Sequence, residues 1–252
     1  MSKKKIVIFS GAGLDRESGV LTFRDCKDGL WNNHKIDDVA TPKGWSKDRS
    51  KVLDFYNERR RQMPEVHPND AHFALAALEE EFDVIHVTQN VSDLLERAGA
   101  TNIIHLHGEL TKARTSFGMN NPRLVDTQEP IDIGYNDINL GDVDEDGVQL
   151  RPHIVWFGEY PFGINRAYQA FRNADVVLII GTSLNIGYTL NFFDEVKKTT
   201  PIIYIDPEPS KTLDAQHFDI KVEYITKGAV EGVQEIIDRL IIQEIGDDKN
   251  DK

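Results

Sequence analysis

The chain is 252 residues long, with 40% hydrophobic and 28% charged residues, which suits one large soluble α/β domain or one domain with a smaller insertion. Its net charge of −13 argues against nucleic acid as the main partner, because a phosphate backbone requires a basic face, whereas a basic peptide would be attracted. The single cysteine, Cys26, excludes an internal disulfide and a cysteine-based zinc module.

The first predicted element is a strand at residues 5–10, KIVIFS. Its apolar run is too short for a signal peptide or a membrane span. We therefore expect a cytoplasmic protein without a membrane partner.

Strands and helices alternate along the rest of the chain, and most strands are apolar on both faces. This pattern predicts a parallel sheet covered on both sides, that is, a doubly wound, Rossmann-like α/β fold. The predicted strands are residues 5–10, 83–89, 103–107, 153–158, 175–181, 201–206 and 220–226, and the predicted helices are residues 44–62, 70–80, 92–98, 164–173, 188–199 and 229–242.

Two stretches fit the sheet less well, since residues 27–81 are rich in predicted helix and residues 111–150 are rich in loop. We expect them to form a smaller lobe within a single domain of residues 1–252. The Rossmann part is then about residues 1–26, 82–110 and 151–242, followed by a flexible tail at 243–252.

The stretch FSGAGLDRESG directly follows the first strand and carries Gly11 and Gly13. Glycines at this point of a doubly wound sheet let the backbone approach a nucleotide pyrophosphate. A plain strand-to-helix turn is the alternative, because this spacing is not the usual glycine fingerprint. Arg24 could clamp a phosphate or form a surface ion pair.

Polar residues also end two later strands. Gln89 and Asn90 in VTQN could fix ribose hydroxyls or a water, although Asn90 could simply cap the next helix. The turn GTSLN, from Gly181 to Asn185, offers hydroxyls and backbone N–H groups to a ligand, or is an ordinary turn stabilised by its hydroxyls.

The run IIHLHGEL places His105 and His107 two residues apart, so on a strand they would share a face. They could bind a metal as a pair, lie in the core with satisfied nitrogens, or comprise one structural residue and one base. A metal pair would need further ligands, and the sequence offers no obvious ones.

The motifs GAGLDRESGVLTFR, TQNVSDL, HLHGEL, RPHIVWFGE and GTSLN occur in the order and at the spacing of the sirtuins. The resemblance covers residues 5–240 and implies a Rossmann domain with a smaller lobe. It also implies NAD-dependent removal of acyl groups from protein lysines, giving nicotinamide and O-acyl-ADP-ribose. The segments DGLWNNHKIDDVATPKGW and FYNERRRQ resemble the bacterial branch that includes desuccinylases.

The resemblance assigns roles to residues. His107, directly before the glycine of HG, corresponds to the catalytic base, and Asn90 would assist it, whereas His105 would pack beneath. An acyl-lysine protein or peptide is implied as partner, and it would add as a strand. The implied NAD site comprises Gly11, Ala12, Gly13, Phe23, Arg24, Gln89, Asn90, Ser92, Gly181, Thr182, Ser183 and Asp206, and the implied substrate edge comprises Val155, Phe157, Gly158 and Glu159.

The chain departs from the sirtuin pattern at several positions. Most sirtuins carry two Cys-x-x-Cys pairs in the lobe, but Thr115 and Asp144 stand where two of those cysteines would fall, so no metal is expected. Ser92 replaces an Asp that helps to hold the nicotinamide carboxamide. Asp15 replaces a serine and brings a negative charge near the phosphate loop. Asp206 replaces an asparagine and can still accept from ribose hydroxyls.

Tyr56 and Arg59 are candidate contacts for the acyl group, and they share a face at i, i+3 of a predicted helix. Sirtuin desuccinylases carry Tyr-x-x-Arg here, where the pair binds the distal carboxylate of succinyl- or malonyl-lysine. A guanidinium fork suits a carboxylate, and a phenol adds a donor. A solvated basic face is the alternative, since Arg59, Arg60 and Arg61 run together.

Three further hypotheses remain open at this point. The chain could be an NAD glycohydrolase or ADP-ribosyl-transferring enzyme, or a weakened NAD-binding module. The acidic turn DVDEDG at residues 142–147 begins like a calcium loop, but position twelve would be His153 rather than Glu. The sequence does not determine the target proteins or the oligomeric state.

Overall fold

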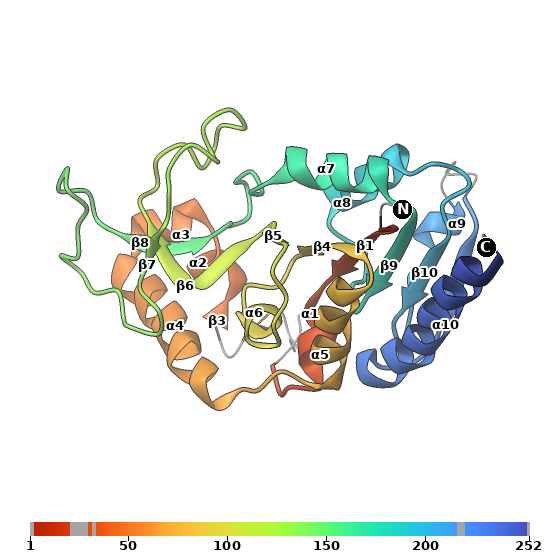
Figure 1. Ribbon diagram of the computed structural model, residues 1–252. Coiled ribbons are helices and arrows are strands. Elements are labelled where there is room, and N and C mark those ends of the chain that lie inside the picture. Colours follow the sequence, from red (N-terminus) through yellow and green to blue (C-terminus); the bar gives the residue numbers. More distant parts are fainter. Residues whose placement is uncertain (1–2, 21–29, 32–33, 216–219, 251–252) are drawn as a thin grey trace.

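The computed structural model describes residues 3–20, 30–31, 34–215 and 220–250 (Figure 1). Its centre is a six-stranded parallel sheet in the order β11-β10-β9-β1-β4-β5. The predicted parallel sheet is confirmed. The strands are β1 (Lys5–Ser10), β4 (Asp83–Thr88), β5 (Ile103–His105), β9 (Val176–Ile180), β10 (Ile202–Ile205) and β11 (Val222–Ile225).

The alternation of side chains along β1 explains why helices cover both faces of this sheet. Ile6 and Ile8 belong to the core beneath α5 (Asp70–Ala77) and α10 (Ala229–Asn250). Val7 and Phe9 point the other way, into the core beneath α7 (Ile164–Asn173). Successive residues of a strand face opposite sides, so an apolar strand requires a cover on each side.

The run at residues 153–158, predicted as a strand of the parallel sheet, lies elsewhere, and that prediction was wrong. Here β8 (Arg151–Ile154) pairs antiparallel with β6 (Gly108–Arg114) in a separate sheet of order β7-β6-β8, completed by β7 (Ile131–Asp132). Gly108 redirects the chain with φ +85°, and a Cβ on it would meet the carbonyl oxygen of His153 at 1.9 Å. An apolar run predicts a strand but does not identify its partner.

Local capping changes several predicted helices. Residues 44–62 divide into α3 (Pro42–Lys47) and α4 (Arg49–Gln62), because Asp48 accepts the N–H of Lys51 and starts a new helix. α10 continues to Asn250, so the flexible tail predicted from 243 is helical there, since no proline interrupts it. The other elements are α1 (Ala12–Arg16), β2 (Leu30–Trp31), β3 (His34–Lys35), α2 (Ile36–Val39), η2 (Met63–Glu65), η3 (Leu78–Glu80), α6 (Leu94–Arg97), α8 (Gly187–Leu190), η4 (Asn191–Glu195) and α9 (Thr212–Ala215).

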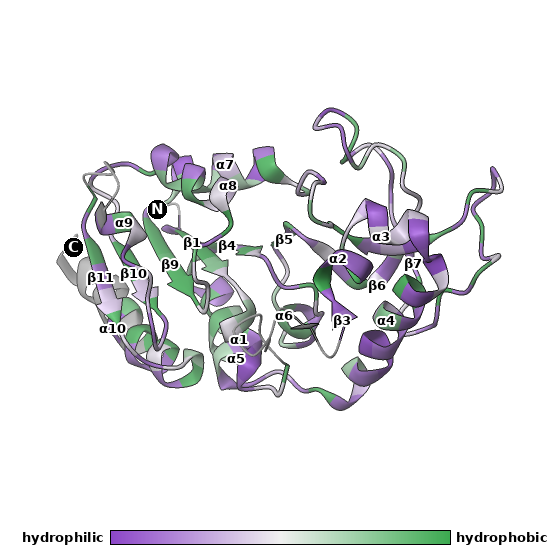
Figure 2. Ribbon diagram, turned by 180° about the vertical axis from the view of Figure 1, so that it is seen from behind, coloured by the Kyte–Doolittle hydropathy of each residue, from purple (hydrophilic) through white to green (hydrophobic). Residues whose placement is uncertain are grey.

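The smaller lobe packs around α4. Figure 2 shows mostly hydrophilic residues along α4, whereas β9 in the main sheet is hydrophobic. Its core contains Trp45, Phe55, Tyr56 and Trp156. None of the helices in the described residues has the length and apolar character that crossing a membrane requires.

Buried polar side chains tie the loops of this lobe to α4. Arg60 donates to the carbonyl of Leu110 (2.6 Å) and to Asn57 Oδ1 (2.7 Å). Asn57 in turn exchanges two hydrogen bonds with the backbone of Ile138. Arg114 donates to three backbone carbonyls, those of residues 115, 117 and 125. These contacts order loops that no disulfide constrains.

The residues at the two expected cysteine positions have polar partners. Thr115 pairs with Gln128, and Asp144 accepts the N–H groups of Asp146 and Val148. The carboxylates of residues 142–147 do not gather into a group of ligand atoms in the described chain. Backbone donors close this turn, and calcium binding by it stays a prediction.

Candidate functional site

The glycine turn after β1 is locked against the turn after β9. Gly11 N donates to Ile180 O, and Gly13 N donates to Gly181 O at 2.7 Å. A Cβ on Gly13 would lie 2.5 Å from Gly181 Cα, and Gly181 itself has φ +61°. Glycine is therefore required at both positions for the close approach. The arrangement leaves a backbone turn at the carboxyl edge of the sheet, where nucleotide phosphates bind in such folds.

The GTSLN turn carries backbone strain beside this edge. Leu184 adopts φ +55° although it is not glycine, and its side chain is buried. Thr182 holds the turn, because its Oγ1 accepts from Gln89 Nε2 at 3.1 Å and its carbonyl accepts from Tyr204. The predicted residues Gln89 and Thr182 thus lie together.

A cavity of about 350 Å³ opens next to the glycine turn. Segments from both halves of the molecule line it: the turn after β1, the residues that follow β4 and β5, the segment after β8, and α4. Among the predicted site residues, those that line the cavity are Ala12, Tyr56, Gln89, Asn90, Ser92, His107, Val155, Phe157, Gly158 and Glu159.

His107 is a neutral imidazole that lines this cavity, and both of its ring nitrogens are hydrogen-bonded. Nδ1 lies 3.0 Å from the carbonyl of Gln89, so Nδ1 carries the proton and donates it. Nε2 then accepts from the hydroxyl of Tyr188 at 2.7 Å. Burial lowers the pKa of His107 to about 4. A group that is unprotonated at neutral pH and hydrogen-bonded to a hydroxyl has the geometry of a general base.

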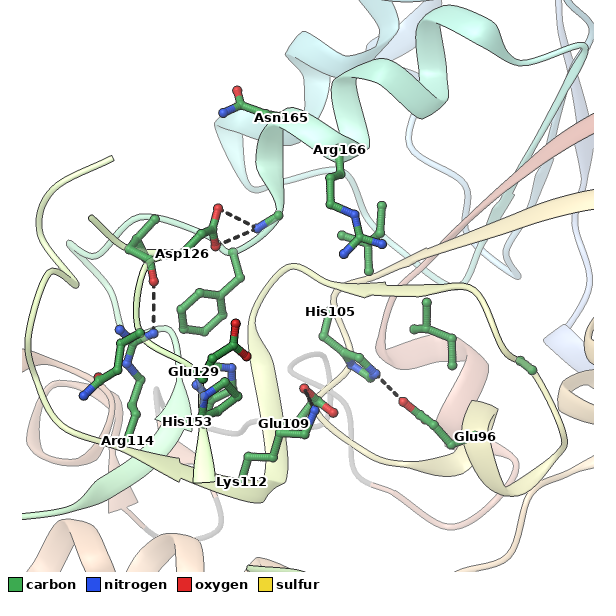
Figure 3. Close-up of a pocket in the computed structure, with 18 of the residues that line it drawn as sticks. Glu96, His105, Glu109, Lys112, Arg114, Asp126, Glu129, His153, Asn165 and Arg166 are labelled. Carbon is green, nitrogen blue, oxygen red and sulfur yellow. Dashed lines mark hydrogen bonds and ion pairs between the residues drawn. The ribbon is translucent and has the colours of Figure 1, made fainter. Parts of the chain in front are cut away.

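His105 faces a different pocket, of about 530 Å³, where Figure 3 shows it directed at Glu96 with Glu109 and Lys112 nearby. Its Nδ1 lies 3.1 Å from Asn90 O and its Nε2 lies 2.7 Å from Glu96 Oε1. Burial opposes protonation, but the hydrogen bond and charge of Glu96 raise the pKa of His105 above its ordinary value. The two histidines therefore do not form a metal pair.

The described residues contain one group of three potential metal ligands, Glu96, His105 and Glu109, whose ligand atoms lie within 4.8 Å of one another. Each already has a partner, since Glu96 pairs with His105 and Glu109 pairs with Lys112 at 2.8 Å. The sequence did not indicate this cluster, because Glu96 and Glu109 belong to elements that meet His105 only in the fold.

Asp15 is a buried carboxylate at the end of the cavity next to Asn90. Asn90 Nδ2 donates to Asp15 Oδ1 at 2.7 Å and to Gly11 O at 3.0 Å. Ser92 Oγ donates to Asp15 Oδ2 at 2.7 Å, and His72 Nε2 lies 3.2 Å from Oδ1. Three side chains from other elements therefore converge on this one carboxylate.

The segment after β8 forms another wall of the cavity. The N–H groups of Val155, Trp156 and Phe157 all donate within the chain, to His107 O, Glu159 Oε2 and Ala40 O. A ligand that lies along this segment would therefore donate to its carbonyl oxygens. The ring of Phe157 is exposed at the surface.

Glu159, which was predicted as a substrate contact, has partners within the chain. Its carboxylate forms a buried ion pair with Arg151 at 2.6 Å and accepts the N–H of Trp156. Its side chain thereby shapes the segment, and its contact with a peptide stays a prediction.

Tyr56 and Arg59 differ in their placement. Tyr56 lines the cavity, and its hydroxyl accepts from Trp156 Nε1 at 3.1 Å, which leaves the hydroxyl proton for another acceptor. Arg59 donates to Phe55 O and its guanidinium lies 3.2 Å above the Phe55 ring. Burial lowers the pKa of Arg59 to about 10. Arg59 and Arg60 are buried, so the solvated-face alternative holds only for Arg61.

The remaining predicted positions lie around the nucleotide edge or outside the described chain. Asp206 follows β10, is buried, and accepts the N–H of Glu208. Ser183 is half-buried in the GTSLN turn. Phe23 and Arg24 lie outside the described residues. Sequence reasoning missed Tyr188, because nothing in its segment signals contact with a histidine 81 positions earlier.

Three comparisons with known proteins agree with this geometry. Residues 11–187 match the model of the Sir2 family. The chain is 46% identical to an NAD-dependent protein deacylase of Helicobacter pylori and 43% identical to one of Bacteroides thetaiotaomicron, in both cases over 94% of this chain and 98% of the relative. A solved Sir2 homologue–NAD complex superposes with a TM-score of 0.79 at 32% identity, covering 96% of this chain and 91% of the other.

Proposed function

The chain belongs to the Sir2 family, and from that premise we infer that it is an NAD-dependent protein deacylase that acts on acyl-lysine in proteins or peptides. The single observation that supports this best is the neutral His107, with Nε2 turned into a cavity shared by the glycine turn and the segment after β8.

In this reaction NAD is consumed as a substrate: its ribosyl group receives the acyl group and nicotinamide leaves. The turn at Gly11–Gly13 would lie against the phosphates, and because the N–H groups of both glycines already donate within the chain, its part is the close backbone approach that glycine allows. His107 Nε2 takes the proton of a ribose hydroxyl, in the place where Tyr188 now donates. Carbonyl oxygens after β8 accept the N–H of the acyl-lysine. A water molecule then adds and releases the lysine amine, so the products are free lysine, nicotinamide and O-acyl-ADP-ribose.

Incubation with NAD, with and without an acyl-lysine peptide, tests this function. Release of nicotinamide that depends on the peptide is the expected result. Release without peptide would identify a glycohydrolase, and no release with intact NAD binding would identify a non-catalytic binding module.

For the acyl group we propose succinyl- or malonyl-lysine, processed at least as well as acetyl-lysine. Tyr56 supports this choice, because its hydroxyl can donate into the cavity and its helix also carries Arg59 one turn later. Arg59 is held now by Phe55 O and the Phe55 ring, so it must change rotamer to reach a carboxylate in the cavity. A charge-assisted hydrogen bond formed there would contribute about 1.5–3 kcal/mol.

Arg59→Met tests this assignment, with Arg61→Met as its matched control. Arg61 is the exposed neighbour whose guanidinium pairs with Asp137. We expect Arg59→Met to lower kcat/KM for succinyl-lysine by about 10- to 100-fold while acetyl-lysine changes little. Equal losses for both peptides, or a wild type that processes acetyl-lysine alone, would refute the role of Tyr56 and Arg59.

A further inference from the structure

The chain differs from the sirtuin pattern at two positions near the glycine turn, and the structure joins them by a hydrogen bond. Asp15 stands where the sirtuin resemblance implies a Ser, and Ser92 stands where it implies an Asp. Ser92 Oγ lies 2.7 Å from Asp15 Oδ2, and both side chains are buried. The two differences thus leave one carboxylate and one hydroxyl in the same contact, with their positions exchanged.

This carboxylate sets the orientation of Asn90. Both hydrogens of the Asn90 amide nitrogen are used, one on Asp15 Oδ1 and one on Gly11 O. Asn90 Oδ1 is therefore the atom of this amide that remains as an acceptor toward the cavity. If the carboxylate were absent, the amide could rotate by 180° and present a donor instead.

The same contact sets the polarity of Ser92. A hydroxyl has one proton, and Ser92 directs it to Asp15 Oδ2. The lone pairs of Oγ are then left for a donor in the cavity. Asn90 and Ser92 together present acceptors at this end, and an amide NH₂ is a ligand group that matches two acceptors.

The third partner of Asp15 is His72, which lies in the first turn of α5. Asn69, the residue that caps the start of this helix, fixes His72 as a donor. Asn69 N donates to His72 Nδ1 at 3.3 Å, so the proton of this ring is on Nε2, which faces Asp15 Oδ1. His72 of α5 therefore donates to the carboxylate of Asp15, and Asn90 and Ser92, which line the cavity, donate to the same carboxylate. A carboxylate that accepts fixed donors on both oxygens keeps its neighbouring side chains in one orientation.

We propose that Asp15 is a positioning residue for the carboxamide of nicotinamide: it acts through Asn90 and Ser92, and it forms with Ser92 an exchangeable carboxylate–hydroxyl pair. This inference rests on the proposed NAD-dependent function. It implies that the two side chains can be swapped as a unit but not one at a time.

A double-mutant cycle of Asp15→Ser, Ser92→Asp and the combined variant tests the pair. Asp15→Ser removes the shared acceptor, and Ser92→Asp places two carboxylates in contact in a buried site, where both cannot remain ionised. We expect each single change to lower kcat for peptide-dependent nicotinamide release by about 10- to 100-fold, with a smaller change in KM for NAD, because the glycine turn is intact. The combined variant should return to within about fivefold of the wild type.

Asp175→Ser is the matched control, because Asp175 accepts a backbone N–H from Lys5 at the opposite end of the strands. It should leave kcat unchanged. Should Asp15→Ser fail to fold, Asp15→Asn and Ser92→Ala replace the single variants. Asp15→Asn keeps the shape but loses the carboxylate, and it should still lower kcat.

The results divide clearly. If the fold-loss in kcat of the combined variant equals the product of the two single fold-losses, the inference is overturned. Single variants that lose thermal stability yet keep kcat would also overturn it. The affinity for nicotinamide, measured by NMR on the wild type and the three variants, reports the coupling between positions 15 and 92 without any turnover. If the wild type does not deacylate, the proposed function fails, and coupling in nicotinamide affinity still decides the role of Asp15.

Discussion

His153 makes the protein sensitive to acid, and replacing it with Phe should remove part of that sensitivity. The ring is buried against Phe162, with a centroid distance of 4.3 Å and an interplanar angle of 11°. Burial, together with the nearby cations Arg114, Lys112 and Arg151, lowers the pKa of His153 to about 3 from an ordinary value of 6.5. A Phe ring can keep the stacking and cannot titrate.

The direction in which pH changes the free energy of unfolding follows from which state binds the proton of His153. Above pH 6.5 His153 is neutral in the folded and unfolded chains and contributes no pH dependence. As the pH falls from 6.5 toward 3, the unfolded chain gains a proton that the folded chain does not, so the free energy of unfolding falls. At pH 5.5 this loss is about 1.4 kcal/mol.

Urea denaturation of the wild type and of His153→Phe at pH 8 and pH 5.5 measures this effect. The variant should gain about 1.4 kcal/mol relative to the wild type between the two pH values, or about 3–6 °C in Tm. His67→Phe is the control, because the side chain of His67 is exposed in the folded chain. An identical stability difference at both pH values would show that His153 does not titrate as its surroundings require.

Three further predictions concern the site and the lobe. His107→Ala should abolish product formation while NAD still binds by calorimetry, whereas His105→Ala should retain turnover; near-normal turnover of His107→Ala would contradict the base assignment. Gly13→Ala should weaken NAD binding by about 100-fold, because the new Cβ meets the backbone of Gly181, and Gly187→Ala, which adds a Cβ in open space, should not. The purified protein should hold no stoichiometric zinc and should keep its Tm in a chelator, because Arg60 and Arg114 tie the lobe; one zinc per chain by elemental analysis would overturn this.

The central sheet could be predicted from the sequence because its signal is local. Runs such as residues 5–10 and 175–181 are apolar on both faces, and only a strand covered on both sides buries such a run. The glycine turn was also predictable, since Gly11 and Gly13 directly follow the first strand, and this order alone places them at the carboxyl edge of the sheet. The order of the motifs was sufficient to identify the family.

What the sequence could not supply depends on contacts between distant residues. Residues 151–154 joined the second sheet because Gly108 turned β6 toward them, and no local pattern records that partner. His105 and His107 look alike in the sequence, yet burial lowers the pKa of His107, whereas the hydrogen bond and charge of Glu96 raise that of His105. The pairing of positions 15 and 92 likewise exists only where β1 and β4 lie side by side, because a hydrogen bond requires atoms to meet in space and not along the chain.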